Sequence, residues 1–229
     1  QKMLEIQESI SVPQNRNYFL DQHLDELEKM DFIYREKNTE HTFRFKHILI
    51  QDMVYDMLLI ERRKKLHEIV GRYIEKFNSH SLEDLYEILA YHYCNSNNAK
   101  LAVFYLTKSG DKNRKSILGS AESAIRYFNN ALDTLNISSL IPYDRATNEQ
   151  SIFDGMGEVF KDLGEYEKAL SSFETMLHAT EQTKDFRMRS EALRQIANIN
   201  AQIDNWEFAL DAYEKSLSIV KDLGDLPRI

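Results

Sequence analysis

The chain has 229 residues, of which 42% are hydrophobic and 29% charged, and its formal net charge is -8. This length allows one large or two small domains with a buried core, and the composition is that of a globular protein rather than a disordered one. The negative charge argues against nucleic-acid binding by the whole chain, because attraction to phosphates requires a positive field. The longest apolar runs are also too short to span a bilayer.

The first quarter of the chain predicts a helix followed by a short hairpin. We expect residues 1–17, which are polar, to form a loop or a frayed helix. Apolar residues then recur every three or four positions, as they do in an amphipathic helix. Alternation with a period of two in Phe32–Arg35 and Thr42–Lys46 predicts two strands of a hairpin. This order of elements favours a winged-helix-like remnant over residues 18–60.

Winged helices often bind DNA, but the predicted helix is poorly suited to it. The helix that would enter the groove carries four acidic residues: Asp21, Asp25, Glu26 and Glu28. Phosphates would repel these side chains. We therefore expect this segment to have a structural role and no nucleic-acid partner.

Residues 61–136 begin with a strongly one-sided helix and a basic run, Glu61–Lys65. This run is interpreted as a solvated start of a helix, with a nuclear signal or a phosphate-binding patch as alternatives. For His47 and His67 we expect capping or interhelical hydrogen bonding rather than catalysis.

Residues 61–136 and 145–229 predict paired helices that cross closely. Small residues stand at the expected crossings, flanked by large apolar ones; the key alanines are Ala102, Ala124, Ala169 and Ala209. We expect one long helix from Ala99 to about Ser116 that packs on two neighbours. Helices should end before Pro142 and restart near Ala146, because proline destabilises a helix interior. Trp206 is predicted to lie in the core.

The stretch Ser151–Thr180 resembles a tetratricopeptide (TPR) helical hairpin. The residues that carry this resemblance are Gly157, Phe160, Gly164, Tyr166, Ala169 and Phe173. It implies a mainly α fold in which a TPR-like helical-hairpin superhelix follows the winged-helix-like segment with its one β-hairpin. It also implies that a concave face of the array binds a protein or peptide.

Counting from the matching alanines places six candidate residues on that face. They are Asp154, Glu158 and Lys161 in one repeat, and Arg194, Asn198 and Gln202 in the next. Arg194 and Asn198 resemble the arrangement with which family members grip a peptide carboxylate. The nearby Asp154 and Glu158 would oppose such a ligand, and an ordinary solvated face is the alternative.

A second resemblance covers about residues 20–136. Phe43–Tyr55, with Leu58-Leu59, Arg62-Arg63 and Leu66-His67 at fixed spacing, is similar to a junction in large signalling ATPases of the STAND and AAA types. In those proteins the junction lies between the nucleotide-binding domain and a TPR array, and class III adenylate or guanylate cyclase-linked and soluble adenylyl cyclase-like proteins share it. The resemblance implies an upstream ATPase domain of the same chain as a partner. It also implies a third interpretation of the basic run, a contact with that domain through Arg62 and Arg63.

The sequence shows no catalytic, cofactor or metal site. Gly110–Ser116 ends in Lys-Ser like a phosphate loop, but Arg114 replaces the required glycine and no strand precedes it. The seven histidines lack metal-ligand spacing backed by a third ligand. We therefore expect this fragment not to be an enzyme, although its parent protein could be a nucleotide cyclase or ATPase.

The remaining predictions concern context. The single cysteine, Cys94, cannot form an internal disulfide, and the start of the sequence has no signal-peptide pattern. We expect a cytoplasmic fragment of a longer protein, in which the array continues because its last helix lacks a polar cap. The predicted function is a protein–protein interaction and regulatory module that relays binding to the ATPase domain. The alternative is a stand-alone TPR scaffold or self-association module.

Overall fold

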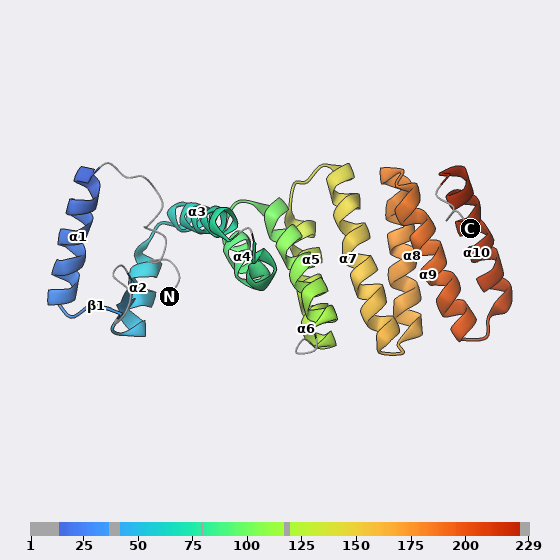
Figure 1. The fold of residues 1–229 in the computed structure, drawn as a ribbon, viewed down its shortest axis with the longest axis horizontal. Coiled ribbons are helices and arrows are strands. Elements are labelled where there is room, and N and C mark those ends of the chain that lie inside the picture. Colours follow the sequence, from blue (N-terminus) through green and yellow to red (C-terminus); the bar gives the residue numbers. More distant parts are fainter. Residues whose placement is uncertain (1–13, 37–41, 79, 117–119, 225–229) are drawn as a thin grey trace. The chain divides into compact units, whose positions relative to one another are not determined.

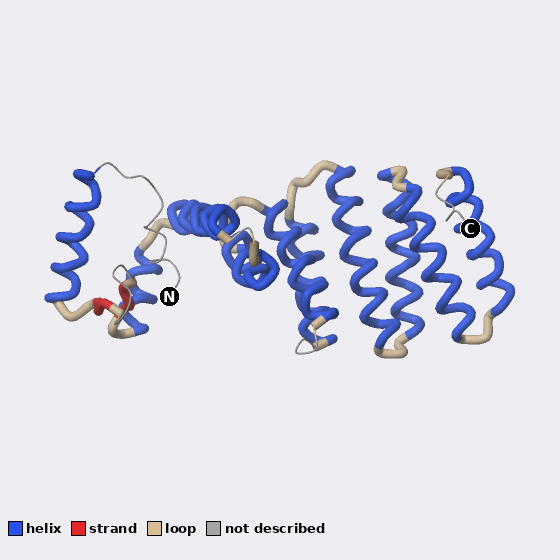
Figure 2. Tube along the Cα trace, viewed as in Figure 1, coloured by secondary structure: helices blue, strands red, loops and turns tan. Residues whose placement is uncertain are grey.

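The computed structural model describes residues 14–36, 42–78, 80–116 and 120–224. Within these residues the fold is mainly α, with ten α-helices, one short 3-10 helix and a single two-stranded sheet (Figures 1 and 2). The chain divides into two compact units. The N-terminal unit comprises Gln1–His80 with Asn95–Asn97, and the C-terminal unit comprises Ser81–Cys94 with Asn98–Ile229.

The N-terminal unit contains a helix, a hairpin and two further helices. Their bounds are α1 Gln14–Lys29, β1 Ile33–Arg35, β2 Phe43–Phe45, α2 Ile48–Met57 and α3 Ile60–Phe77. The strands are antiparallel, and Leu24 of α1 packs on Ile33 and Phe43 in a small core. The predicted helix and hairpin are confirmed. The winged-helix interpretation stays a prediction, and most of the stretch predicted as a loop or frayed helix lies outside the described residues.

Acidic residues of α1 hold the hairpin in place. The Nε atom of Arg35 donates to Glu28 at 3.0 Å, and a second nitrogen of its guanidinium contacts Asp25. Hydrogen bonds from Arg35 lower the pKa of the Glu28 carboxyl. Two of the four acids that we expected to repel DNA therefore have a structural partner.

A hydrogen bond joins α2 to α3. The His67 ring, which is buried, lies with its Nε2 atom 2.8 Å from the Tyr55 hydroxyl. Arg63 adds an ion pair of 3.1 Å with Asp56 and lies over the Tyr55 ring. The expected interhelical bond of His67 is confirmed, whereas His47 occupies the N-cap of α2 without a capping hydrogen bond from its side chain. Burial lowers the pKa of His67.

The C-terminal unit is a row of helices. Their bounds are η1 Leu82–Leu85, α4 Tyr86–Cys94, α5 Ala99–Lys115, α6 Ala121–Ile137, α7 Pro142–Asp162, α8 Tyr166–Thr183, α9 Phe186–Gln202 and α10 Trp206–Asp222. Successive helices pack as the hairpins α5/α6, α7/α8 and α9/α10, which lie side by side (Figure 1). The first helices of the hairpins, α5, α7 and α9, also contact one another in order.

Small residues allow these helices to cross. A Cβ atom on Gly157 would lie 2.6 Å from the Phe173 ring, and one on Gly155 would lie 2.3 Å from Phe128. The predicted alanines, including Ala169 and Ala209, are buried. The spacing of small and large residues therefore sets how closely the paired helices approach.

The last two hairpins repeat each other at an interval of forty residues. Ala169 of α8 and Ala209 of α10 lie forty residues apart, and so do Tyr166 and Trp206, the first residues of these helices. The turn inside each hairpin also repeats, with a positive φ of 74° at Gly164 and 59° at Asp204. An aspartate tolerates this left-handed backbone better than most residues.

Three predictions about the helices can be compared with the structure. The long helix near Ala99 is confirmed as α5, which packs on both α4 and α6. The predicted break before Pro142 is confirmed, but the restart near Ala146 is wrong because α7 begins at Pro142 itself. Proline is favourable in the first helical position, where its missing N–H would have no partner within the helix. The prediction for Trp206 is also wrong, since its side chain is 65% exposed.

Candidate protein-binding face

The first helices of the three hairpins bring their polar side chains together. We call this surface the first-helix face. Its members are Asp111 and Arg114 of α5, Asp154, Glu158 and Lys161 of α7, and Glu191, Arg194 and Gln195 of α9. Four of the six predicted residues lie here, among them Asp154 and Arg194. The other two, Asn198 and Gln202, lie further along α9.

Ionic and hydrogen bonds connect the three repeats across this face. Glu158 is the centre, because one carboxylate oxygen lies 2.6 Å from Lys161 Nζ and the other 3.8 Å from Arg114 Nη1. Lys161 also donates to Gln195 Oε1 at 3.2 Å, and so links α7 to α9. Charge-assisted bonds of this kind favour one relative position of neighbouring helices when they are shielded from water, as these half-buried side chains are.

On α9 the same row of contacts continues within the helix. Gln195 donates from Nε2 to Glu191 Oε1 at 2.9 Å, and Arg194 Nε donates to Glu191 Oε2 at 3.0 Å. Burial raises the pKa of the Glu191 carboxyl, but hydrogen bonds from Arg194 and Gln195 and the nearby positive charges outweigh it, so the pKa is lowered. Glu191 thus stays ionised and holds Arg194 against its own helix.

Asp154 differs from its neighbours on this face. Its carboxylate has no hydrogen bond or ion pair to any residue that the structure describes, although it is half-buried. Burial, then the nearby Glu158, Glu191 and Asp111 carboxylates, raise its pKa to about 6, while Arg114 opposes the shift. At neutral pH the face therefore holds a carboxylate that would be stabilised by an added positive charge.

The two residues of the predicted carboxylate clamp already have partners. Arg194 is held by Glu191, and Asn198 Oδ1 accepts a hydrogen bond of 2.6 Å from the Tyr213 hydroxyl of α10. Peptide binding at this pair would first require these contacts to break. The clamp stays a prediction, and Gln202 is exposed at the end of α9.

Sequence reasoning missed half of the first-helix face. Asp111 and Arg114 were considered only as part of a false phosphate loop, and Glu191 and Gln195 were not considered at all. A spacing signal was present, since Glu191 lies three residues before Arg194 and Gln195 lies four after Glu191. Which side of α5 would face α7 was not readable from that spacing.

The predicted interdomain arginines have different surroundings. Arg63 pairs with Asp56 inside the N-terminal unit, whereas Arg62 is exposed and has no ion pair to a described residue. The interdomain contact stays a prediction for both.

Two further findings concern metal ions and membranes, and both apply to the described residues. Within it, no group of three or more His, Cys, Asp or Glu side chains is placed to hold a metal ion. No helix among the described residues combines the length and the apolar character needed to cross a membrane.

Comparison with known proteins identifies the class of the last two hairpins. The tetratricopeptide repeat model matches residues 152–187 and 192–227. The first match begins within α7 and covers α8, and the second begins within α9 and covers α10. A search of curated proteins finds no significant match to this chain. The C-terminal unit thus contains a tetratricopeptide-like region, and the forty-residue interval seen in the structure is the interval between the two matches.

Proposed function

We propose that this chain is a non-catalytic protein–protein interaction module that binds a segment of a partner protein on the first-helix face. The observation that carries the proposal is the tetratricopeptide match over α7 to α10, together with the polar row that crosses the first helices. Repeats of this class present such surfaces to proteins and peptides. A surface with side chains from three successive hairpins suits an extended or helical segment.

The charges of the face favour a basic segment. Two ion pairs, Glu158 with Lys161 and Glu191 with Arg194, neutralise most of the charge on this face. Asp154 has no ion-pair partner among the described residues. A lysine or arginine of the partner placed beside Asp154 would form the missing ion pair in a half-buried position. Burial strengthens such a pair relative to one in water, because the local dielectric constant is lower.

A peptide-binding experiment with the whole 229-residue chain tests this proposal. Binding is measured by fluorescence anisotropy for matched peptide sets that are basic, acidic or neutral. We expect basic peptides to bind, and Asp154→Lys to weaken that binding at least about tenfold, which is about 1.4 kcal/mol. Asp133→Lys, on the exposed side of α6, is the matched control and should change affinity less than about twofold.

The same experiment distinguishes the carboxylate clamp. If acidic or C-terminal carboxylate peptides bind best, and Arg194→Glu abolishes that binding, the clamp is correct and the basic-segment proposal is wrong. If charge reversal at Asp154, Glu158 and Arg194 leaves all binding unchanged, the first-helix face is not the binding surface.

The wider role is a regulatory module of a larger signalling ATPase linked to a nucleotide cyclase, in which junction helices relay binding to the ATPase domain. This part of the proposal is supported by the resemblance of residues 20–136. The exposed apolar residues of α2, among them Leu49, Met53 and Met57, are consistent with contact to a neighbouring domain. The test is ATP hydrolysis by the parent protein with and without a bound peptide, repeated with Asp154→Lys. The alternative is a stand-alone scaffold or self-association module, in which case no hydrolysis would respond.

A further inference from the structure

The first-helix face holds one carboxylate more than it has cations. Its charged members are four acids and three bases: Asp111, Asp154, Glu158 and Glu191, and Arg114, Lys161 and Arg194. The central charged side chains are shielded from water, since Glu158, Lys161 and Arg114 are only 19%, 21% and 20% exposed. A carboxylate in excess among such groups is less stable in its charged form than on an open surface.

Asp154 is the carboxylate in excess, because each cation of the face already lies beside another acid. Lys161 Nζ lies 2.6 Å and Arg114 Nη1 3.8 Å from the carboxylate of Glu158. The third cation, on α9, is held by Glu191. An incoming basic side chain therefore pairs with Asp154 without having to break a contact within the face.

The charges that act on Asp154 come from three helices: α7 itself, α5 and α9. Burial, then the carboxylates of Glu158, Glu191 and Asp111, raise its pKa, while the guanidinium of Arg114 opposes them. Among the described residues of α6 and α8, which also pack on α7, none contributes to this shift. The proton affinity of Asp154 is thus set by the same first helices that form the face.

We propose that binding at the first-helix face is linked to a proton: the partner's basic side chain and a proton compete for the Asp154 carboxylate, so that acidification releases the partner. This inference rests on the function proposed above. Above neutral pH the carboxylate is charged and pairs with a lysine or arginine. In acid the carboxyl is neutral, and the incoming cation loses its ion pair in a half-buried position, where water replaces it poorly.

The expected size of the effect follows from linkage. The pKa of Asp154 is raised to about 6, so its charged form is lost as pH falls through that value. If the charged form alone accepts the cation, the affinity should be about tenfold weaker at pH 5 than at pH 7.5. An aspartate with the ordinary pKa of 3.8 would change the affinity by less than about a tenth over the same range.

The first experiment measures peptide affinity against pH. Fluorescence anisotropy is recorded between pH 7.5 and pH 5 with the whole chain and a basic peptide that has blocked termini and no Asp, Glu or His. The charge of this peptide is constant over the range, so a change in affinity reports the protein. We expect the tenfold loss for the unchanged chain. Asp154→Asn should bind more weakly at pH 7.5, and its affinity should vary less than about threefold with pH.

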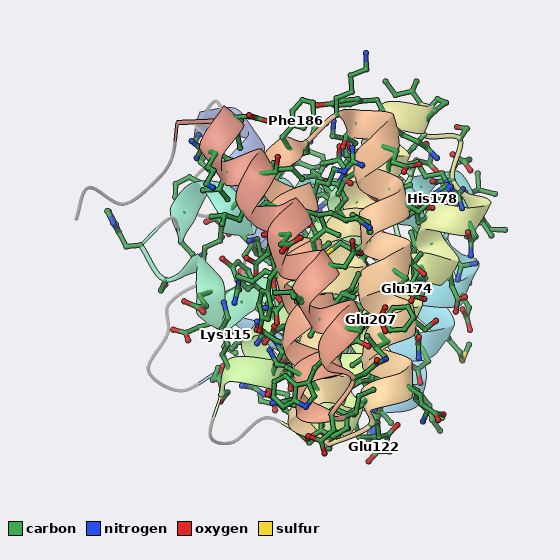
Figure 3. All side chains as sticks on the ribbon, turned by 90° about the vertical axis from the view of Figure 1, so that its right-hand side faces the viewer. Lys115, Glu122, Glu174, His178, Phe186 and Glu207 are labelled. Carbon is green, nitrogen blue, oxygen red and sulfur yellow. The ribbon has the colours of Figure 1, made fainter. Side chains whose placement is uncertain are left out.

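The matched control removes a carboxylate from a second helix. Glu174 is exposed on α8, and Figure 3 shows it on the other side of the C-terminal unit from Lys115 of the first helix α5. Glu174→Gln should keep both the affinity at pH 7.5 and the tenfold loss at pH 5. Circular dichroism at both pH values shows whether each protein is folded.

A second pair of measurements detects the proton itself. Calorimetry at pH 6, in two buffers with different heats of ionisation, should show that peptide binding releases about half a proton, and that Asp154→Asn releases much less. Carbon NMR of the side-chain carboxyls should give Asp154 a midpoint near pH 6 in the free chain. The midpoint should move to lower pH when the peptide is bound. Both readouts are obtained without going to pH 5.

The outcomes separate this inference from the function on which it rests. If no basic peptide binds at pH 7.5, both are overturned. Binding that is equally tight at pH 7.5 and pH 5, or a carboxyl midpoint near 4, overturns the proton linkage and leaves the binding function standing. If Asp154→Asn loses affinity with pH as steeply as the unchanged chain, another group is responsible, such as Asp111, whose pKa burial also raises, and the assignment to Asp154 is wrong.

Discussion

The α7/α8 and α9/α10 hairpins share one sequence pattern, but several equivalent positions carry different residues with different surroundings. Phe173 is buried against Gly157 in the first hairpin, whereas the equivalent Tyr213 of the second is 38% exposed and bonded to Asn198. Position 154 is an aspartate that no described residue pairs with, and its equivalent forty residues later is Arg194, held by Glu191. The comparison shows that the repeat pattern determines which positions contact a neighbouring helix. The residues on that neighbouring helix determine how much each contact stabilises the protein.

The largest expected contrast is between the two equivalent aromatic residues. Phe173→Ala should lower the free energy of unfolding by about 3 to 5 kcal/mol, because it removes a fully buried ring and leaves a cavity. Tyr213→Ala should cost about 1 kcal/mol, since its ring is already partly in water. Urea denaturation at low protein concentration measures both, and equal losses would contradict the view that the two hairpins are packed differently.

The helix crossings give the next contrast. Gly157→Ala should destabilise the protein by about 1 to 3 kcal/mol, because its new methyl group would lie 2.6 to 2.8 Å from three atoms of the Phe173 ring. The equivalent residue of the second hairpin is already an alanine, Ala197, and Ala197→Gly should cost about 1 kcal/mol from lost helix propensity. The double change Gly157→Ala with Phe173→Leu supplies the check, since it should recover part of the loss by making room. No recovery would locate the strain elsewhere.

The predictable parts of this structure are those that depend on local pattern. The sequence predicted buried alanines such as Ala169 and Ala209, the hairpin before α2 and the break before Pro142. Each of these features leaves a periodicity or a backbone constraint in the sequence. The exposure of Trp206 was not readable. Trp206 begins α10 as Tyr166 begins α8, but Tyr166 is partly buried because α9 packs on α8, and the spacing within α10 does not show whether Trp206 has such a neighbour.

The candidate site was predictable only in part, for a related reason. Counting from the alanines placed Asp154 and Glu158 on one side of α7, and in the structure both lie near charged residues of the neighbouring first helices. The state of Asp154 depends on Asp111 and Glu191, which belong to the helices on either side and are dozens of residues away in sequence. Likewise, the pairing of Arg194 with Glu191 is a choice of side-chain conformation that residue spacing permits but does not require.

A third contrast concerns pH. The folded pKa of Asp154 is raised to about 6, above the ordinary value of 3.8, so the folded state binds its proton more tightly than the unfolded state does. Its ionisation therefore destabilises the fold fully above about pH 6, and the penalty fades as pH falls toward 4. Asp154→Asn should stabilise the protein at pH 7 by on the order of 1 kcal/mol, and by clearly less at pH 4.5.

The control for this prediction is a carboxylate on an outer helix. Asp133→Asn, at an exposed position in the middle of α6, should change the free energy of unfolding by less than about 0.5 kcal/mol at either pH. The urea midpoints of both variants are compared at pH 7 and 4.5. Because all other groups titrate in the same way in both variants, their effect cancels in the difference between the two midpoints. A gain for Asp154→Asn that is the same at both pH values would show that burial of its charge is not the cause.

The smallest expected effect comes from making the second hairpin resemble the first. Tyr213→Phe removes the hydroxyl that donates to Asn198 at 2.6 Å and introduces the residue found at position 173. We expect a change below about 0.5 kcal/mol in urea denaturation, because both groups are partly exposed and water can replace the bond. A loss above about 1.5 kcal/mol would mean that this hydroxyl bond, rather than the close packing of helices, holds α10 on α9. In that case the comparison of the two hairpins would rest on polar contacts as much as on buried rings.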